Sequence, residues 1–135
     1  MNKIFLKNVI GLLEKLEQTQ EEIIDQVAAV CAESIYNGGL LYFFGTGHSH
    51  MICEEPFYRA GGLACIYPIL ETDLMLHEGA SKGSQYERLE GMGNIVERML
   101  EKGMNPPLFM SSNSDGGDKA NKSVLEVYRE RIPSL

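Results

Sequence analysis

Six consecutive residues from Gly45 to His50 have the composition of an anion-binding turn. They read Gly-Thr-Gly-His-Ser-His and follow directly on the apolar run 40–44. Gly45 and Gly47 allow a tight turn and a close backbone approach to a ligand, while Ser49 can cap a helix and offer its hydroxyl to a phosphate. The turn lacks the Gly-Lys-Ser/Thr ending of a P-loop, so an ordinary connection between a strand and a helix remains the alternative.

Four side chains in or after this turn can transfer protons, namely those of His48, His50, Glu54 and Glu55. Imidazole and carboxylate groups are the usual general acids and bases of enzymes. The two glutamates also have a structural alternative, because Arg59 follows them at a spacing that forms ion pairs along a helix. The sequence therefore leaves open whether these glutamates serve proton transfer or a structural ion pair.

The same histidines could bind a metal ion. His48 and His50 form a His-x-His pair, and His77 and Glu78 lie farther along the chain. Alternate residues of an extended loop can direct two imidazoles at one ion. We favour a loop histidine that hydrogen-bonds a substrate or caps the helix, and we expect neither a metal nor a cofactor.

The elements that position these residues alternate between helix and strand. Apolar residues recur at steps of three and four in the first third of the chain, which predicts two helices within residues 3–36. A capping-box pattern at Thr19 and Glu22 predicts the start of the second helix. The apolar run 40–44 and the segments 63–67 and 108–110 are typical of buried strands.

Helices and loops are expected between these strands. A helix over 49–59 should be interrupted at Pro56, which lacks an N–H group. The connection 69–83 is longer than usual, and a helix is predicted from Ser84 to Gly103.

The last part of the chain adds a polar turn over 111–117 and a helix from Asp118. Strands that alternate with helices predict a parallel sheet covered on both faces. We therefore expect one α/β domain over residues 1–135, a three-layer α/β/α sandwich in which two helices precede the order β-α-β-α-β-α.

The composition fits a single soluble domain. The chain has 135 residues, 44% of them hydrophobic, and a formal net charge of −7. Its 12 Lys and Arg residues are scattered, which argues against a nucleic-acid partner. Three separated cysteines among apolar residues indicate reduced thiols. We expect a cytoplasmic protein with no membrane partner.

Longer motifs match a known family. The turn 45–49 and the Ser-Asn-Ser sequence at 112–114 resemble the two serine loops of the sugar isomerase (SIS) domain, as found in phosphoheptose isomerases. The segments 54–63 and 76–80 resemble a bacterial branch of SIS-domain phosphosugar-binding proteins. The resemblance covers residues 20–114 and implies a parallel sheet of flavodoxin-like topology.

The resemblance implies a sugar-phosphate site at the carboxyl edge of the sheet. Family isomerases move a proton between C1 and C2 of an opened sugar, with a glutamate or a histidine as base. The alternatives to a phosphosugar isomerase are a non-catalytic phosphosugar-sensing module and an inactive truncated relative. The substrate-binding residues carried over are Gly45, Thr46, Gly47, Ser49, Ser112, Asn113 and Ser114, and the proton-transfer candidates remain His48, His50, Glu54 and Glu55.

Two departures from the family pattern stand out. Asp115 replaces the glycine that normally follows the second serine loop, and its carboxylate would either repel a phosphate or cap a helix. The family sheet has about five strands, so the chain looks shortened after about residue 114. An apolar stripe near the N-terminus then predicts a homodimer or higher homo-oligomer. The stripe consists of Val9, Leu12, Leu13 and Leu16.

Overall fold

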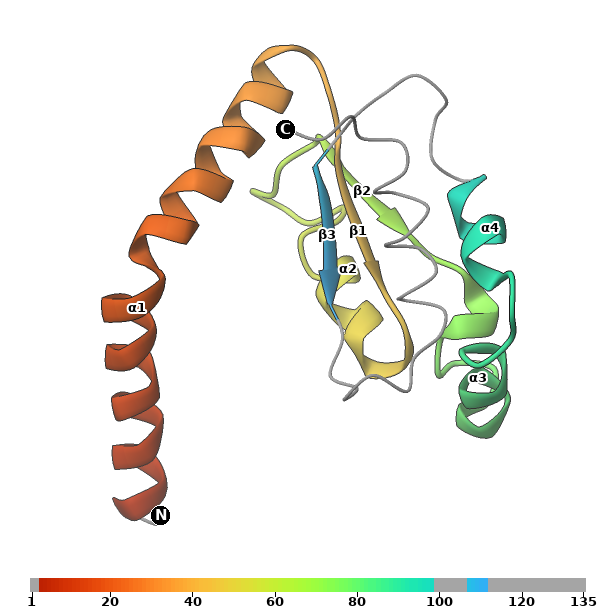
Figure 1. Cartoon of the computed structure of the whole chain (residues 1–135), viewed down its shortest axis with the longest axis horizontal. Helices are drawn as coiled ribbons and strands as arrows, with labels where there is room; N and C mark the ends of the chain where they lie inside the picture. Colours follow the sequence, from red (N-terminus) through yellow and green to blue (C-terminus); the bar gives the residue numbers. More distant parts are fainter. Residues whose placement is uncertain (1–2, 99–106, 112–135) are drawn as a thin grey trace.

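A three-stranded parallel sheet forms the centre of the protein. A computed structural model describes residues 3–98 and 107–111 (Figure 1). The strands are β1 (Leu41–Gly45), β2 (Ile66–Ile69) and β3 (Leu108–Ser111), and β1 lies between the other two. Both neighbours run parallel to β1. The prediction of an α/β fold with a parallel sheet is therefore confirmed.

The core lies on one face of β1. Alternate side chains of a strand point to opposite faces, so Tyr42 and Phe44 share one side. Both are fully buried, and α4 (Met92–Glu97) packs against them. The remaining buried members of this cluster are Ile69, Leu74, Met92 and Val96.

The opposite face of β1 presents Phe43. Its ring stacks on Phe109 of β3, with the ring centroids 4.7 Å apart. Beside Phe43, Met51 and Ile52 of α2 (Met51–Glu54) line a shallow pocket. Helices therefore pack on both faces of the sheet, as a three-layer arrangement requires.

The first helix differs from its prediction. α1 runs without interruption over Lys3–Tyr36, so the prediction of two helices is wrong. Thr19, expected to cap a second helix, donates its hydroxyl hydrogen to the carbonyl oxygen of Lys15 at 2.8 Å. A side-chain bond to the preceding turn is compatible with a continuous helix and often bends it. Figure 1 shows α1 bending near its middle.

α1 contributes no buried residue. It extends away from the sheet, to which it is joined through the turn at Gly38 (Figure 1). Gly38 has a φ of 76°, and its N–H donates to the carbonyl oxygen of Ile35 at 3.0 Å, as in many helix C-termini. None of the helices within the described residues is long and apolar enough to cross a membrane.

The second strand lies later than predicted. β2 includes Pro68, which was expected to follow the strand 63–67. Proline lacks the N–H group of a sheet ladder and is tolerated on edge strands. β2 is an edge strand of the described sheet, so Pro68 can pair in register opposite Phe43.

The segment predicted to be one helix from Ser84 to Gly103 also differs from its prediction. Within the described residues this segment holds the end of α3 (Ala80–Tyr86) and all of α4. The break falls at Gly91, whose φ of 81° is left-handed and ends a helical path. The predicted helix from Asp118 lies outside the described residues.

Candidate functional site

The turn after β1 starts with a contact that leaves no room for a side chain. A Cβ atom at Gly45 would lie 2.7 Å from the carbonyl carbon and oxygen of Ser49. Gly47 has a φ of 53°, which glycine adopts without strain. The chain folds back into the 3-10 helix η1 (Gly47–His50), which continues into α2. The tight turn predicted from the two glycines is therefore present.

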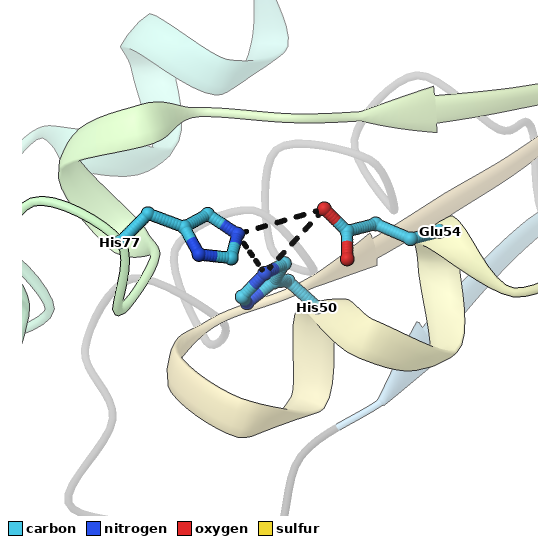
Figure 2. Close-up of side chains that lie close together, drawn as sticks. All are labelled: His50, Glu54 and His77. Carbon is cyan, nitrogen blue, oxygen red and sulfur yellow. Dashed lines mark hydrogen bonds and ion pairs between the residues drawn. The ribbon is translucent and has the colours of Figure 1, made fainter.

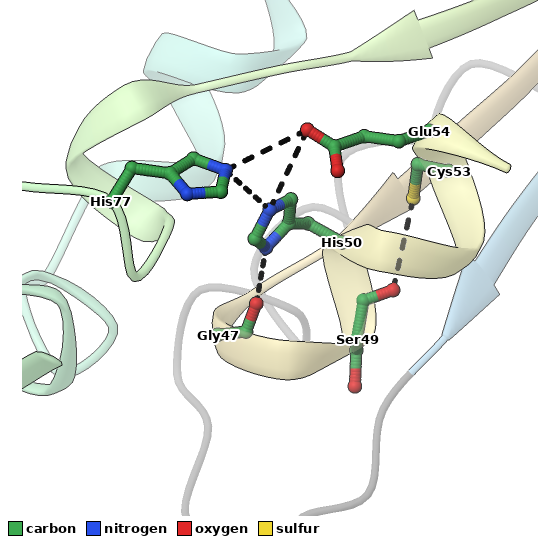
Figure 3. Close-up of polar contacts among 6 residues, drawn as sticks. All are labelled: Gly47, Ser49, His50, Cys53, Glu54 and His77. Atoms are coloured by element: carbon green, nitrogen blue, oxygen red, sulfur yellow. Dashed lines mark hydrogen bonds and ion pairs between the residues drawn. The ribbon is translucent and has the colours of Figure 1, made fainter. Parts of the chain in front are cut away.

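The polar side chains of this turn are buried. Thr46 and Ser49 are almost completely covered, and the N–H of Ser49 donates to the carbonyl oxygen of Thr46 at 2.9 Å. The thiol of Cys53 donates to the carbonyl oxygen of Ser49 at 4.0 Å (Figure 3). Burial raises the pKa of this thiol to about 11. Cys53 therefore stays protonated at neutral pH and places no negative charge beside the turn.

His50 is the fully buried histidine at the end of η1. Its Nδ1 contacts the carbonyl oxygen of Gly47 (Figure 3). A carbonyl oxygen can only accept, so Nδ1 carries the hydrogen and donates it. In the neutral ring this leaves a lone pair on Nε2, which points away from Gly47 toward two other polar side chains.

Those two side chains are Glu54 and His77. The Nε2 atoms of His50 and His77 are 3.1 Å apart. Oε1 of Glu54 lies 3.7 Å from Nε2 of His50 and 3.6 Å from Nε2 of His77. Figure 2 shows the three side chains converging on one point, two from the η1–α2 segment and one from the connection after β2. The side chains of Glu54 and His77 are 43% and 59% exposed, so solvent reaches the cluster.

The segment that carries His77 is fixed by Lys82. Nζ of Lys82 lies 2.6 Å from Oδ1 of Asp73 and 3.0 Å from Oε2 of Glu78. The hydrogen bonds to Asp73 and Glu78 raise the pKa of Lys82, which keeps its ammonium group charged. Lys82 thus joins residues on both sides of His77 and acts as a positioning residue.

The turn after β1 lies where the strand order reverses. The chain passes from β1 to β2 on one side and returns to β3 on the other. In open parallel sheets, ligands bind outside the carboxyl ends of the strands at such a switch point. The register places Ser111, the last residue of β3, opposite Gly45. The predicted phosphate-binding residues Ser112, Asn113 and Ser114 come next in sequence and lie outside the described residues.

The structure brings two of the four predicted proton-transfer residues together and leaves the other two apart. His50 and Glu54 meet in the cluster with His77, whereas His48 is exposed. Glu55 forms an ion pair with Arg59, and its side chain is 73% exposed. Glu55 therefore forms the structural ion pair with Arg59 that the sequence offered as the alternative to proton transfer. His50 contacts His77 and not its His-x-His neighbour, which the sequence spacing alone did not indicate.

Two further residues near the turn were missed as site residues. His77 was considered only as a metal ligand together with Glu78, and Glu87 was not singled out. A Cβ atom on Gly47 would lie 3.2 Å from Oε1 of Glu87, so this carboxylate borders the turn. Two sequence signals pointed to this region: the length of the connection 69–83 and the family resemblance of the segment 76–80.

Comparison with known proteins identifies similar chains. A family model described as "SIS domain" matches residues 4–130. A UPF0309 protein of Caldanaerobacter subterraneus is 48% identical over 133 residues, which cover 98% of this chain and 54% of that protein. UPF0309 proteins of Listeria innocua and Listeria monocytogenes are 49% and 38% identical, each over 94% of this chain and 51% of their own length. The chain thus spans about half the length of these curated relatives.

The hydrogen bond to Gly47 predicts the tautomer of His50. Long-range ¹H–¹⁵N correlation spectra at mildly alkaline pH, without added metal, should show His50 protonated on Nδ1 and unprotonated on Nε2. An exposed neutral histidine such as His48 should show the more usual Nε2–H form. A His50 ring protonated on Nε2 would contradict the geometry, because Nδ1 could then not donate to the carbonyl oxygen of Gly47.

Proposed function

We propose that this chain, which belongs to the SIS domain family, binds a phosphorylated sugar at the carboxyl edge of its sheet. The observation that carries the proposal is the position of the glycine-rich turn. This turn follows the central strand at a topological switch point, and its serine is buried beside a cluster of acid–base groups.

The phosphate group is assigned to the turn 45–49. Glycines there allow close backbone approach, and Ser49 supplies a hydroxyl. The sequence 112–114 is assigned as the second half of this subsite, because β3 ends beside Gly45. The carboxylate of Glu87, which borders Gly47, would repel a phosphate and suits a sugar hydroxyl instead.

The cluster of His50, Glu54 and His77 suits aldose–ketose isomerisation. Glu54 takes the proton from C2 of an open-chain aldose phosphate while His77 protonates the carbonyl oxygen on C1. The resulting enediol becomes the ketose when Glu54 returns the proton to C1 and the C2 hydroxyl gives its hydrogen to His77. Glu54 is suited to this role because its carboxylate is partly exposed and contacts both imidazoles.

A non-catalytic phosphosugar-sensing module is the second candidate. It would use the same phosphate turn without proton transfer, and an inactive relative would use neither. Ligand binding and proton exchange separate these possibilities.

Binding is tested by thermal shift with a panel of pentose, hexose and heptose phosphates. A true ligand at about 100 times its dissociation constant should stabilise the protein by roughly 2.7 kcal/mol. Ser49→Ala should weaken that ligand roughly 10- to 100-fold, because a hydrogen bond to a charged group is lost. Ser84→Ala, an exposed serine inside α3, is the matched control and should bind normally. No shift with any sugar phosphate would overturn the proposal.

Catalysis is tested by exchange of the sugar's C2 hydrogen with deuterium from D₂O. Glu54→Gln should reduce the exchange rate by at least 100-fold, because the amide cannot accept the proton. Glu55→Gln is the matched control and should keep nearly the full rate, since Glu55 pairs with Arg59. Ligand binding without exchange in the wild-type protein would favour the sensing module. Equal rates in the two variants would exclude Glu54 as the base.

We further propose that α1 associates with a second copy of the chain. Leu12, Leu13 and Leu16 are 67%, 61% and 52% exposed, and they lie on one side of a helix without buried residues. A continuous apolar stripe of this kind is typical of a subunit contact.

Light scattering at micromolar concentration tests this association. The wild-type protein should be a dimer or a higher oligomer, and Leu13→Glu should shift it to smaller species by placing a charge in the contact. Gln18→Glu adds a charge on the opposite side of α1 and should leave the mass unchanged. A wild-type monomer would rule out the association.

A further inference from the structure

We propose that His50, Glu54 and His77 form a binding site for a divalent transition-metal ion of the Zn²⁺ type. Each of the three side chains offers one ligand atom, and these atoms all lie within 4.8 Å of one another. Two imidazoles and one carboxylate are a common ligand set for zinc. The site differs from the His-x-His pair considered above, because His77 replaces His48, and it departs from the expectation that the protein binds no metal.

The spacing of the ligand atoms fits one ion. The two Nε2 atoms are 3.1 Å apart, and Oε1 of Glu54 lies 3.7 Å and 3.6 Å from them. The circle through these three points has a radius of about 2.0 Å, so an ion at or slightly above its centre meets the usual zinc–nitrogen and zinc–oxygen distances of about 2.0–2.2 Å. The three ligand atoms thus already have the spacing that one ion requires.

The tautomer of His50 leaves its Nε2 atom free to bind an ion. Its Nδ1–H donates to the carbonyl oxygen of Gly47, which leaves the lone pair on Nε2 directed at the other two ligands. Metal-binding histidines almost always have such an outer hydrogen bond, which fixes the ring and raises its basicity. A buried His50 held in this way forms the rigid part of the site.

The ligand set also indicates the class of ion and its reactivity. Nitrogen-rich sites favour Zn²⁺, Co²⁺ or Ni²⁺ over Ca²⁺ and Mg²⁺, which prefer oxygen ligands. Three protein ligands leave a coordination position open, as in catalytic zinc sites. The partial exposure of Glu54 and His77 gives an oxygen ligand access to that position.

The inference concerns the same residues as the proposed function but does not depend on it, and it replaces the proton-transfer role of Glu54 when an ion is bound. A bound ion would occupy the lone pairs used for proton transfer, so Glu54 would no longer be the base. An ion held by His50, Glu54 and His77 would supply Lewis-acid polarisation of a sugar oxygen at its open position. Ion binding is measurable without any sugar, which keeps the two proposals separable.

The test uses the 135-residue chain, freed of metal with a chelator and titrated with ZnCl₂ by calorimetry. One equivalent of Zn²⁺ should bind per chain, and Co²⁺ should give the visible absorption of a four-coordinate ion. His77→Ala and Glu54→Gln should each weaken Zn²⁺ binding by at least tenfold. His48→Ala and Glu55→Gln are the matched controls and should keep the wild-type affinity.

The altered side chains of Glu54 and His77 are partly exposed, so these variants should fold, as circular dichroism can verify. Absence of stoichiometric binding would overturn the inference. So would binding that His77→Ala and Glu54→Gln leave unchanged, because the ion would then be held elsewhere, for example by a cysteine. Sugar phosphates that bind the metal-free protein would leave the proposed function intact in either case.

Discussion

The close approach of Gly45 to Ser49 is the constraint on which the rest of the site depends. Any side chain at Gly45 would overlap the carbonyl group of Ser49, so only glycine lets the chain fold back directly at the end of the central strand. The reversal sets the direction of η1 and brings His50 into the protein interior. Because β1 is the central strand, the turn also lies at the switch point between its two neighbours.

The direction of this short helical segment explains why two adjacent glutamates have different roles. Successive residues of a helix are about 100° apart, and a residue four positions on lies on the same side. Glu54 follows His50 by four residues and therefore points at the histidines, whereas Glu55 turns outward to Arg59. α2 ends at Glu54, two residues before Pro56, which cannot continue the hydrogen-bonding of a helix. Glu54 is therefore the one carboxylate that α2 contributes to the site.

Most features set by local sequence could be predicted, whereas those set by contacts between distant segments could not. The apolar run before Gly45 indicated the central strand, and the glycines indicated the turn. The Thr19 pattern misled because a helix, once nucleated, propagates through weak cap signals. The position of β2 depends on pairing with β1, which allowed Pro68 into an edge strand. His77 lies 27 residues beyond His50, so no spacing rule could pair them.

The cluster joins two sides that are held in different ways. His50 is fixed by burial and by a backbone hydrogen bond, while His77 lies on a connection held through the ion pairs of Lys82. Ion pairs between solvent-accessible side chains of this kind contribute little to stability, because water and salt screen them. A ligand that bridges both sides would therefore supply much of the free energy that keeps His77 next to His50. The side with His50 determines where a ligand binds, and the side with His77 is where binding can tighten the site.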